Sequence, residues 1–253
     1  MNICEITIIL PTRNETRNLP FFLASLPDAI QLIVVDSSED ETPILARRLR
    51  PTNTTVVERP CNVSEARQIG AELARTPWLL FSDADIAFAP DYFDLLSSVG
   101  RCDVLYGPKL SLDDFSNYYR WFARAQAVCQ ALGAPAASGS NLVMRRLALK
   151  AVGGFDRRLA CNEDSEVVWR IQRHGYRTRF DPRLIVYERD HRRLKRGALA
   201  KTAHSALRCA LLYLNLIPSR WRSRDWGYWS NPSQPRLRQT PASLGDRSHA
   251  NHS

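Results

Sequence analysis

The first ninety residues alternate between two hydrophobic patterns. Short apolar runs rich in β-branched and aromatic side chains predict four strands, at 5–10, 31–36, 54–58 and 78–81. Apolar residues at three- and four-residue spacing predict the helices between them, at 18–26, 44–49 and 64–74. We expect Pro11 to end the first strand. Strands that alternate with helices indicate an α/β fold, in which helices cover a parallel sheet.

The pattern is less regular after residue 100. It predicts strands at 103–109, 141–146 and 176–186 and helices at 117–132, 147–152 and 199–216. Another helix should begin near Asn162 and run to about His174, with Asp164 or Ser165 as its N-cap and Gly175 as its stop. Lys109, at the end of one strand, can be exposed. Residues 231–253 are rich in Pro, Ser, Gln and Arg, so we expect them to be disordered.

Two of the predicted strands end in carboxylates. Asp36 closes the strand 31–36, and Asp83 and Asp85 follow the strand 78–81. Because right-handed crossovers bring the ends of parallel strands to one edge, these aspartates should meet beside the polar loop 11–15. Carboxylate oxygens suit Mg²⁺ or Mn²⁺, and a nucleotide diphosphate can supply further ligands. Asp83 and Asp85 alone could equally be solvated turn residues, but the convergence favours a nucleotide–metal site.

Composition limits the class of protein. The chain has 253 residues, of which 44% are hydrophobic, and no apolar run is long enough to cross a bilayer, which indicates a globular protein with a full core. The N-terminus lacks the basic region of a signal peptide, so we expect a cytoplasmic protein. The six cysteines form no CxxC pair, which disfavours a zinc site or a disulfide framework and predicts reduced thiols, several of them buried.

The positive charge is concentrated late in the chain. The formal net charge is +9, and most of the excess follows Arg170, which suggests an anionic partner: a phosphate, nucleic acid or an acidic membrane face. We expect the helix 199–216 to pack against the protein. Aromatic rings and arginines follow it, however, and this composition suits a membrane interface. Peripheral contact of 199–229 with the inner face of a membrane is therefore an alternative, and it would fit a lipid-linked acceptor.

Six short motifs occur in order between residues 4 and 195. They are ILPTRNE at 9–15, VVDSS at 34–38, ARQIG at 66–70, DAD at 83–85, GGFD at 153–156 and NED at 162–164. Through them the chain resembles the inverting family-2 glycosyltransferases. The resemblance implies a GT-A fold, a Rossmann-like nucleotide-sugar-binding sheet flanked by helices. This domain would span 1–195, with a nucleotide-binding half at about 1–100 and an acceptor half at about 101–195, and would be followed by a helical, aromatic and basic extension at 196–230.

The resemblance also implies a role for each motif residue. The base and ribose of a sugar donor would be held by Pro11, Thr12, Asn14, Glu15 and Asp36. Arg67 would lie near the donor diphosphate. Asp83 and Asp85 would form the DxD motif, with Asp85 the direct ligand of Mn²⁺ or Mg²⁺, and His191 would add a metal or diphosphate contact. Asp164 would be the general base that takes the proton of the acceptor hydroxyl, while the metal neutralises the departing diphosphate.

Plainer roles are open for several of these residues. Asp164 can be only a helix cap, Arg67 a solvated charge and His191 a surface histidine. Glu163 can pair with an arginine or assist the acceptor. Residues 138–141 can be an ordinary loop or can line the sugar pocket.

The sequence therefore favours a metal-dependent glycosyltransferase that uses a UDP-, GDP- or dTDP-sugar, in polysaccharide or glycolipid assembly. One alternative is a nucleotidyltransferase, which typically carries a glycine-rich loop after its first strand. The loop 11–15 contains no glycine, which disfavours that enzyme as well as a dinucleotide site or a P-loop. Another alternative is a non-catalytic basic protein that binds nucleic acid or a membrane. Nucleic acid is disfavoured because no recognition module is visible.

Overall fold

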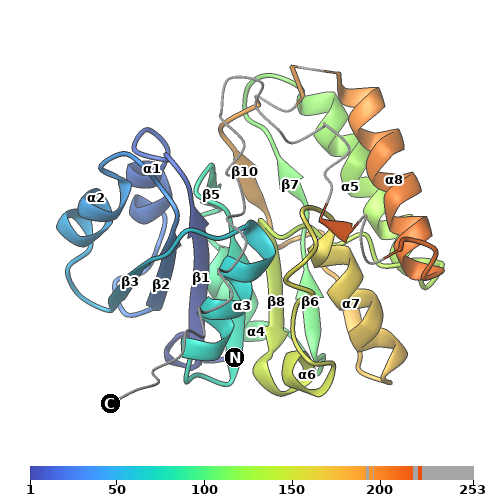
Figure 1. Ribbon diagram of the computed structural model, residues 1–253, viewed down its shortest axis with the longest axis horizontal. Helices are drawn as coiled ribbons and strands as arrows, with labels where there is room; N and C mark the ends of the chain where they lie inside the picture. The colour runs from blue at the N-terminus through green and yellow to red at the C-terminus, as the bar shows by residue number, and fades with distance from the viewer. Residues whose placement is uncertain (192–193, 196, 219–221, 224–253) are drawn as a thin grey trace, which may run out of the picture.

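The computed structural model describes residues 1–191, 194–195, 197–218 and 222–223 (Figure 1). A seven-stranded sheet runs through the molecule in the order β3-β2-β1-β4-β8-β6-β9. In that order the strands span Thr54–Glu58, Gln31–Asp36, Ile6–Thr12, Trp78–Ser82, Asn141–Arg145, Val104–Tyr106 and Thr178–Phe180. The tail 231–253, for which the sequence predicts disorder, lies outside the described residues.

The parallel half of this sheet confirms the alternation in the sequence. β1 pairs in parallel with both β2 and β4, and β2 pairs in parallel with β3. The other half departs from this direction, because β8 is antiparallel to β4 and β6. Every residue of β4 is buried, as expected for a strand whose two faces are covered by helices.

The first strand does not end at Pro11. β1 continues through Pro11 to Thr12, and both residues remain in register with β2. Proline lacks the N–H that a central strand needs on both sides. The pairing of β1 with β4 stops at Ile9, so at Pro11 the strand β1 pairs only with β2. The missing N–H of Pro11 therefore removes no hydrogen bond from the sheet.

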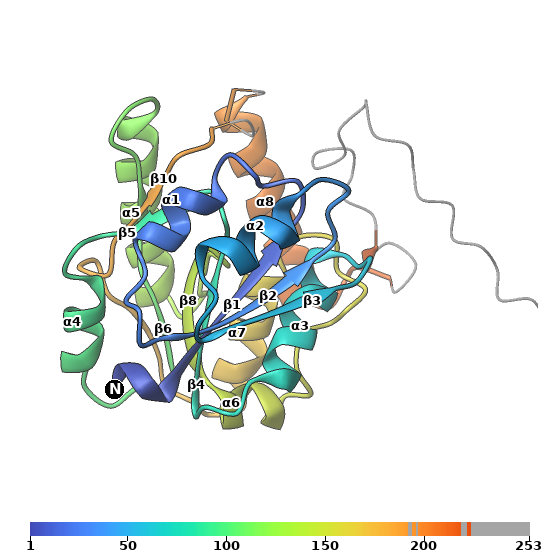
Figure 2. The same cartoon turned by 90° about the vertical axis from the view of Figure 1, so that its left-hand side faces the viewer.

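Two layers of helices cover the sheet (Figure 2). The helices are α1 (Leu19–Ala24), α2 (Thr42–Leu49), α3 (Val63–Leu73), α4 (Tyr92–Ser98), α5 (Ser116–Ala131), α6 (Arg146–Ala151), α7 (Glu163–Arg173) and α8 (Ala198–Tyr213), after a short 3-10 turn at Ile3–Glu5. Alternate residues of β1 enter opposite cores. Ile8 and Leu10 pack with residues of α1, α2 and α4, whereas Ile9 packs with residues of α3, α6 and α7.

The helix that carries the NED motif begins earlier than its predicted cap. Its N-cap is Asn162, which has a left-handed backbone (φ 61°) and makes no capping side-chain bond. The prediction of Asp164 or Ser165 as the cap is therefore wrong, and both residues belong to the first turn. The predicted stop is confirmed, because His174 closes α7 and Gly175 follows with φ +86°.

A small second sheet was not apparent from the sequence. It has the order β5-β10-β7, with strands Ile86–Phe88, Val186–Glu188 and Lys109–Leu110. The single strands expected at 103–109 and 176–186 are each divided between the two sheets. Pro108 and Pro182 lie in these breaks, where a residue without a backbone N–H interrupts a ladder.

Helices α5 and α8 form the outer part of the second half, above α7 in Figure 1. Tyr118 of α5 and Thr202 of α8 are joined by a hydrogen bond of 2.9 Å between their hydroxyls. Trp169 of α7 and Tyr213 of α8 stack with ring centroids 4.5 Å apart. α8 is thus a packing helix over its described length. Among the described residues no helix is long and apolar enough to span a membrane.

The cysteines follow the expectation from their spacing. All six are free thiols, and Cys102 and Cys161 are buried. Burial raises the pKa of Cys209 to about 12, so this thiol is protonated at neutral pH. None of the six therefore contributes a cross-link to the fold.

Candidate active site

The ends of β1 and β2 hold each other through polar side chains. Thr12 donates its hydroxyl to a carboxylate oxygen of Asp36 at 2.6 Å. Asp36 also accepts the hydroxyl of Ser38 at 2.7 Å and its backbone N–H at 3.0 Å. Asp36 is only 2% exposed, so its charge is satisfied inside the protein. This network fixes the two strand ends as one unit.

The loop after β1 is held by the loop after β2. Asn14 has a left-handed backbone (φ 57°), its N–H donates to the hydroxyl of Ser38 at 2.8 Å, and its side-chain oxygen accepts the N–H of Glu39 at 2.9 Å. The N–H of Glu15 donates to the hydroxyl of Thr42 at 2.9 Å. The five residues predicted to hold the nucleotide, Pro11, Thr12, Asn14, Glu15 and Asp36, thus come together on one edge.

A buried cation joins three segments of the site. Arg67, on α3, is 3% exposed and pairs with Asp83 at 2.8 Å and with the buried carboxylate of Glu163. Burial works against the guanidinium charge, but Glu163, Asp83 and Asp164 together raise the pKa of Arg67. Arg67 is therefore not a solvated helix charge, and Glu163 has an arginine partner, one of the two roles that the sequence left open for it.

The loop before β8 passes directly over this cation. A Cβ placed on Gly139 would lie 2.2 Å from the guanidinium nitrogens of Arg67, so only glycine fits there without a shift. The neighbouring Ser140 donates its hydroxyl to the second oxygen of Asp83 at 2.6 Å. Asp83 is therefore bound on both oxygens, to Arg67 and to Ser140.

Asp164 lies in the first turn of α7 and is held by backbone donors. Its two oxygens accept the N–H of Gly139 and the N–H of Ser165, each at 2.7 Å. Burial raises its pKa from the ordinary value, although Arg67 and the two N–H donors act in the opposite direction. A partly exposed carboxylate of raised pKa at a cavity wall has the properties of a general base.

A second cation lies on the other side of Asp83. Lys109, on β7, pairs with the buried carboxylate of Glu188 on β10 and lies 3.4 Å from the hydroxyl of Ser140. Burial works against its charge, but Glu188, Asp85 and Asp83 raise its pKa above the ordinary value. The side chain is 15% exposed, so the reading of Lys109 as exposed is wrong. The small sheet positions this lysine beside the DxD residues.

His191 follows β10 and is buried, which excludes a surface histidine. Its Nδ1 lies 3.1 Å from the hydroxyl of Tyr119, and its Nε2 lies 2.7 Å from a carboxylate oxygen of Asp113 and 3.3 Å from the hydroxyl of Ser111. Both ring nitrogens thus have protein partners. These bonds place His191 between the start of α5 and the segment after β10.

The residues around Lys109 suit a hard divalent cation. Asp83, Asp85 and Glu188 are carboxylates whose charges all act on Lys109. In the described part of the chain no three His, Cys, Asp or Glu side chains form a preassembled metal cluster. Mg²⁺ and Mn²⁺ in nucleotide sites commonly use one or two carboxylates and complete their shell with phosphates and water. The donor chemistry here therefore fits such an ion.

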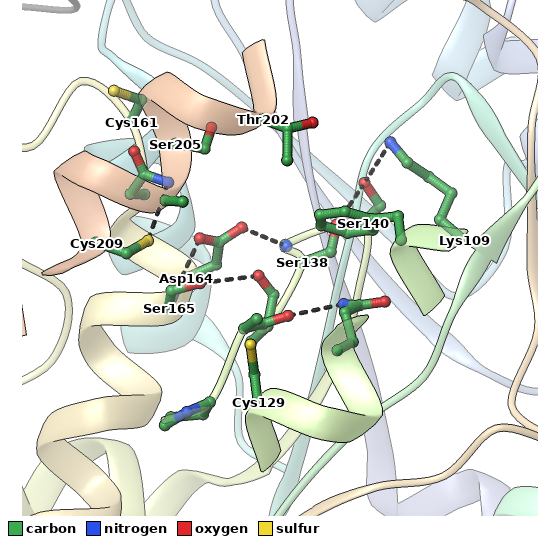
Figure 3. Close-up of a pocket in the computed structure, with 18 of the residues that line it drawn as sticks. Lys109, Cys129, Ser138, Ser140, Cys161, Asp164, Ser165, Thr202, Ser205 and Cys209 are labelled. Carbon is green, nitrogen blue, oxygen red and sulfur yellow. Dashed lines mark hydrogen bonds between the residues drawn. The ribbon is translucent and has the colours of Figure 1, made fainter. Parts of the chain in front are cut away.

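A cavity of about 520 Å³ opens beside Asp164 (Figure 3). Arg67, Asp83 and Lys109 line this cavity together with side chains of α5 and α8. Figure 3 shows Asp164 between α7 and the loop that carries Ser138, with Thr202 and Ser205 of α8 across the cavity. Residues 138–140 line the cavity, which favours a pocket role for this loop over an ordinary connection.

Three of the predicted site residues, Arg67, Asp83 and Asp164, line the cavity, whereas Pro11, Thr12, Asn14, Glu15, Asp36, Asp85 and His191 do not. The importance of two further residues was missed. Glu188 was not selected because it belongs to no motif, and Gly139 was named only as part of the loop 138–141. Glu188 follows a short apolar run at the end of a small-sheet strand, and its partner Lys109 is distant in sequence. A glycine among the small residues of 133–140 was the one signal for the close approach to Arg67.

A comparison with protein families shows which family the chain belongs to. Residues 7–153, more than half of the chain, match the sequence model of glycosyl transferase family 2. The chain belongs to this family. Residues 119–219 also match the model of glycosyl transferase family 21. The family-2 chain is 28% identical over 223 residues to a pre-mycofactocin glycosyltransferase of Mycobacterium tuberculosis, covering 79% of this chain and 45% of that protein.

A second relative comes from another bacterium. The succinoglycan biosynthesis protein ExoA of Rhizobium meliloti is 28% identical over 195 residues, covering 67% of this chain and 58% of that protein. The family-2 chain thus spans about half the length of the curated relatives it matches.

Solved structures show that the family-2 chain has the GT-A fold. The mannosyltransferase PcManGT from Pyrobaculum calidifontis, determined with GDP-Man and Mn²⁺, aligns with a TM-score of 0.64 at 22% identity over 87% of this chain and 72% of that one. S. aureus TarS with UDP-GlcNAc aligns with a TM-score of 0.59 at 15% identity, covering 85% of this chain and 72% of that one. The predicted α/β sheet with flanking helices is therefore confirmed.

Proposed function

We propose that this chain transfers a sugar, with inversion, from a nucleotide-diphosphate sugar to an acceptor hydroxyl. The observation that carries the proposal is the position of Asp164. Its carboxylate is fixed by two backbone N–H groups at the wall of a cavity that Arg67, Asp83 and Lys109 also line. A base on one side of the anomeric carbon and positive charge on the other are what an inverting displacement needs.

The donor occupies the edge formed by β1, β2 and β4. Thr12, Asn14, Glu15 and Asp36 shape the nucleotide end of this edge, since they hold the two loops in one arrangement. Lys109 supplies positive charge near the diphosphate and exchanges part of its pairing with Glu188 for the phosphate oxygens. Arg67 acts mainly by orienting Asp83, because it is enclosed by carboxylates.

A divalent cation, Mn²⁺ or Mg²⁺, completes the donor site. Asp85 is the carboxylate that would hold it, with Asp83 orienting the surrounding groups, and the ion would neutralise charge on the leaving diphosphate. His191 is positioned by Tyr119 and Asp113 and lies on the same side as Lys109 and β10. Support for the cation comes from the donor chemistry of these residues and from the similar fold of PcManGT, whose structure was determined in complex with GDP-Man and Mn²⁺.

The relatives indicate the biological setting. ExoA is named for succinoglycan biosynthesis, and the mycobacterial relative for glycosylation of pre-mycofactocin. We accordingly propose a role in the assembly of a glycan or glycoconjugate. The cytoplasmic location and the contact of 199–229 with a membrane stay predictions, and part of that segment lies outside the described residues.

Thermal unfolding with donor nucleotides tests the proposal. The purified protein is heated with UDP-, GDP- and dTDP-sugars, each with and without Mn²⁺. A ligand that binds only the folded state stabilises it by ~2.7 kcal/mol at one hundred times its Kd. We expect one nucleotide class to raise the midpoint by several degrees, and the increase to require the metal.

Two aspartate variants give the control. Asp85→Ala should lose the metal-dependent increase, whereas Asp91→Ala, an exposed residue at the start of α4, should keep it. If no nucleotide sugar changes the midpoint, or if both variants behave alike, the donor site is wrongly placed.

A further inference from the structure

Two helices contribute much of the wall of this cavity. Its lining includes Tyr118, Trp121 and Ala125 of α5 and Ala206 and Ala210 of α8, together with Asp164. The volume of the whole cavity, about 520 Å³, lies in the range of small-molecule sites. A bound molecule that reaches Asp164 can therefore also contact the two helices.

The polar groups of this wall are largely paired with the protein. The hydroxyl of Tyr118 bonds to that of Thr202 at 2.9 Å, and the side-chain amide of Gln126 donates to the carbonyl of Ala136 at 2.7 Å. Ser165 donates to the carbonyl of Ala137 at 3.0 Å, and the hydroxyl of Tyr213 donates to the carbonyl of Pro135. Besides these paired groups and the hydroxyl of Ser205, aromatic rings, methyl groups and thiols form the wall.

The charged lining residues of the cavity come from segments other than α5 and α8. They are Arg67, Asp83, Lys109, Glu163 and Asp164. Within the described residues of α5 and α8, no charged side chain lines it. A molecule that reaches from Asp164 toward the two helices therefore passes from a polar to an apolar environment.

We infer that the acceptor is amphipathic: its hydroxyl lies at Asp164, and an apolar alkyl or aryl group fills the cavity between α5 and α8. This inference rests on the proposed function, because it assigns Asp164 as the base. A purely polar oligosaccharide would have to give up hydrogen bonds to water along this wall, at a cost for each unpaired hydroxyl. An apolar group gains affinity there in proportion to the area it buries.

Binding of simple glucosides tests the inference. Methyl, hexyl, octyl and phenyl β-D-glucopyranoside are titrated calorimetrically, below their micellar concentrations and with the donor nucleotide present. We expect the affinity to rise about fourfold for each methylene that enters the cavity. A stronger effect of phenyl than of hexyl would assign an aryl group, and the reverse an alkyl chain. Equal affinity of the methyl and octyl compounds would overturn the inference.

A pair of alanines on one helix supplies the matched control. Ala125 lines the cavity, whereas Ala127 is exposed and does not line it. Ala125→Phe should remove the dependence on chain length, and Ala127→Phe should retain it. If both variants bind octyl glucoside like the parent protein, the alkyl group binds elsewhere and the inference fails.

The donor response separates this inference from the proposed function. Ala125→Phe should keep the metal-dependent rise in unfolding midpoint with the nucleotide sugar, because Pro11, Thr12, Asn14, Glu15 and Asp36, the residues proposed to hold the nucleotide, do not line the cavity that Ala125 lines. Chain-length-dependent binding in a protein that ignores every nucleotide sugar would overturn the proposed function and, with it, the assignment of the apolar group to an acceptor. A donor response with no chain-length dependence would overturn the inference alone.

Discussion

The two ends of the proposed active site, the donor edge and the cavity between α5 and α8, are built in opposite ways. At the donor edge, polar side chains from neighbouring strands bind one another, as Thr12, Asp36 and Ser38 do. At the other end, two helices leave a space whose polar groups are turned into the wall. The first arrangement gives a rigid frame in which charge is fixed. The second leaves an open space, and few of its polar groups need a hydrogen-bond partner from a bound molecule.

Asp164 lies at the boundary, and its loss should have the largest effect. Asp164→Asn should lower turnover by about 10²- to 10⁴-fold, because an amide cannot accept the acceptor's proton. Donor binding should persist, since the amide oxygen can still accept one of the two backbone N–H bonds. Turnover and the donor-induced rise in midpoint are measured on the same preparation.

Asp114→Asn, an exposed aspartate outside the cavity, is the control and should retain full turnover. If Asp164→Asn remains as active as this control, another group is the base.

Breaking the buried ion cluster should come next in size. Arg67→Met leaves Glu163 and Asp83 without their cation, and removing one member of a buried pair costs about 3–5 kcal/mol of unfolding free energy. The double variant Arg67→Met/Glu163→Gln should recover part of this loss, because the buried carboxylate is then neutral. Urea unfolding measures both.

A surface ion pair provides the comparison. Arg47 and Glu58 are 50% and 55% exposed, and Arg47→Met should cost no more than about 1 kcal/mol. Equal losses for the Arg47 and Arg67 variants would contradict the buried cluster.

The loop between the two cations allows a smaller perturbation. Gly139→Ala places a methyl group against Arg67 and should cost about 1–3 kcal/mol, the usual range for overpacking. Turnover should fall as well, because the Gly139 N–H is displaced from Asp164. Gly100→Ala, where a Cβ meets nothing within 4 Å, should change stability by less than about 0.5 kcal/mol. Similar losses of unfolding free energy in the two variants would refute the close approach of Gly139 to Arg67.

The pH profile should show the smallest of these effects. A base must be ionised, so turnover falls as the pH drops through the pKa of Asp164. Because burial raises that pKa, the acid limb should be centred above 3.8, the ordinary value for an aspartate. Rates at saturating donor, taken over a range where the fold is intact, give the limb. A profile that stays flat down to pH 4 would disagree with a buried base.

The difference between the two ends also explains what the sequence could reveal. Strands 31–36 and 54–58 have the predicted bounds, because short runs rich in β-branched residues leave a strong local pattern. Asp36, Asp83 and Asp85 could be placed on one edge because they end such strands. The right-handed crossovers of parallel sheets then bring these strand ends to the same edge.

The other end depends on contacts that leave no local pattern. Lys109 and Glu188 meet through a sheet whose strands have two or three residues each, too short for any period to show. Tyr118 and Thr202 meet only because α5 and α8 pack, and the cavity between them is a property of that packing. The sequence supplied the residues that line it, but not their arrangement.

The shared arginine limits how this site can change over generations. Arg67 serves carboxylates from β4 and α7 at once, and a glycine must remain above it. A single replacement of any of these residues leaves a buried charge or a clash, so each step taken alone is penalised. Descendants of this chain can therefore leave the arrangement only by changing several positions together, whereas the walls formed by α5 and α8 can vary one residue at a time.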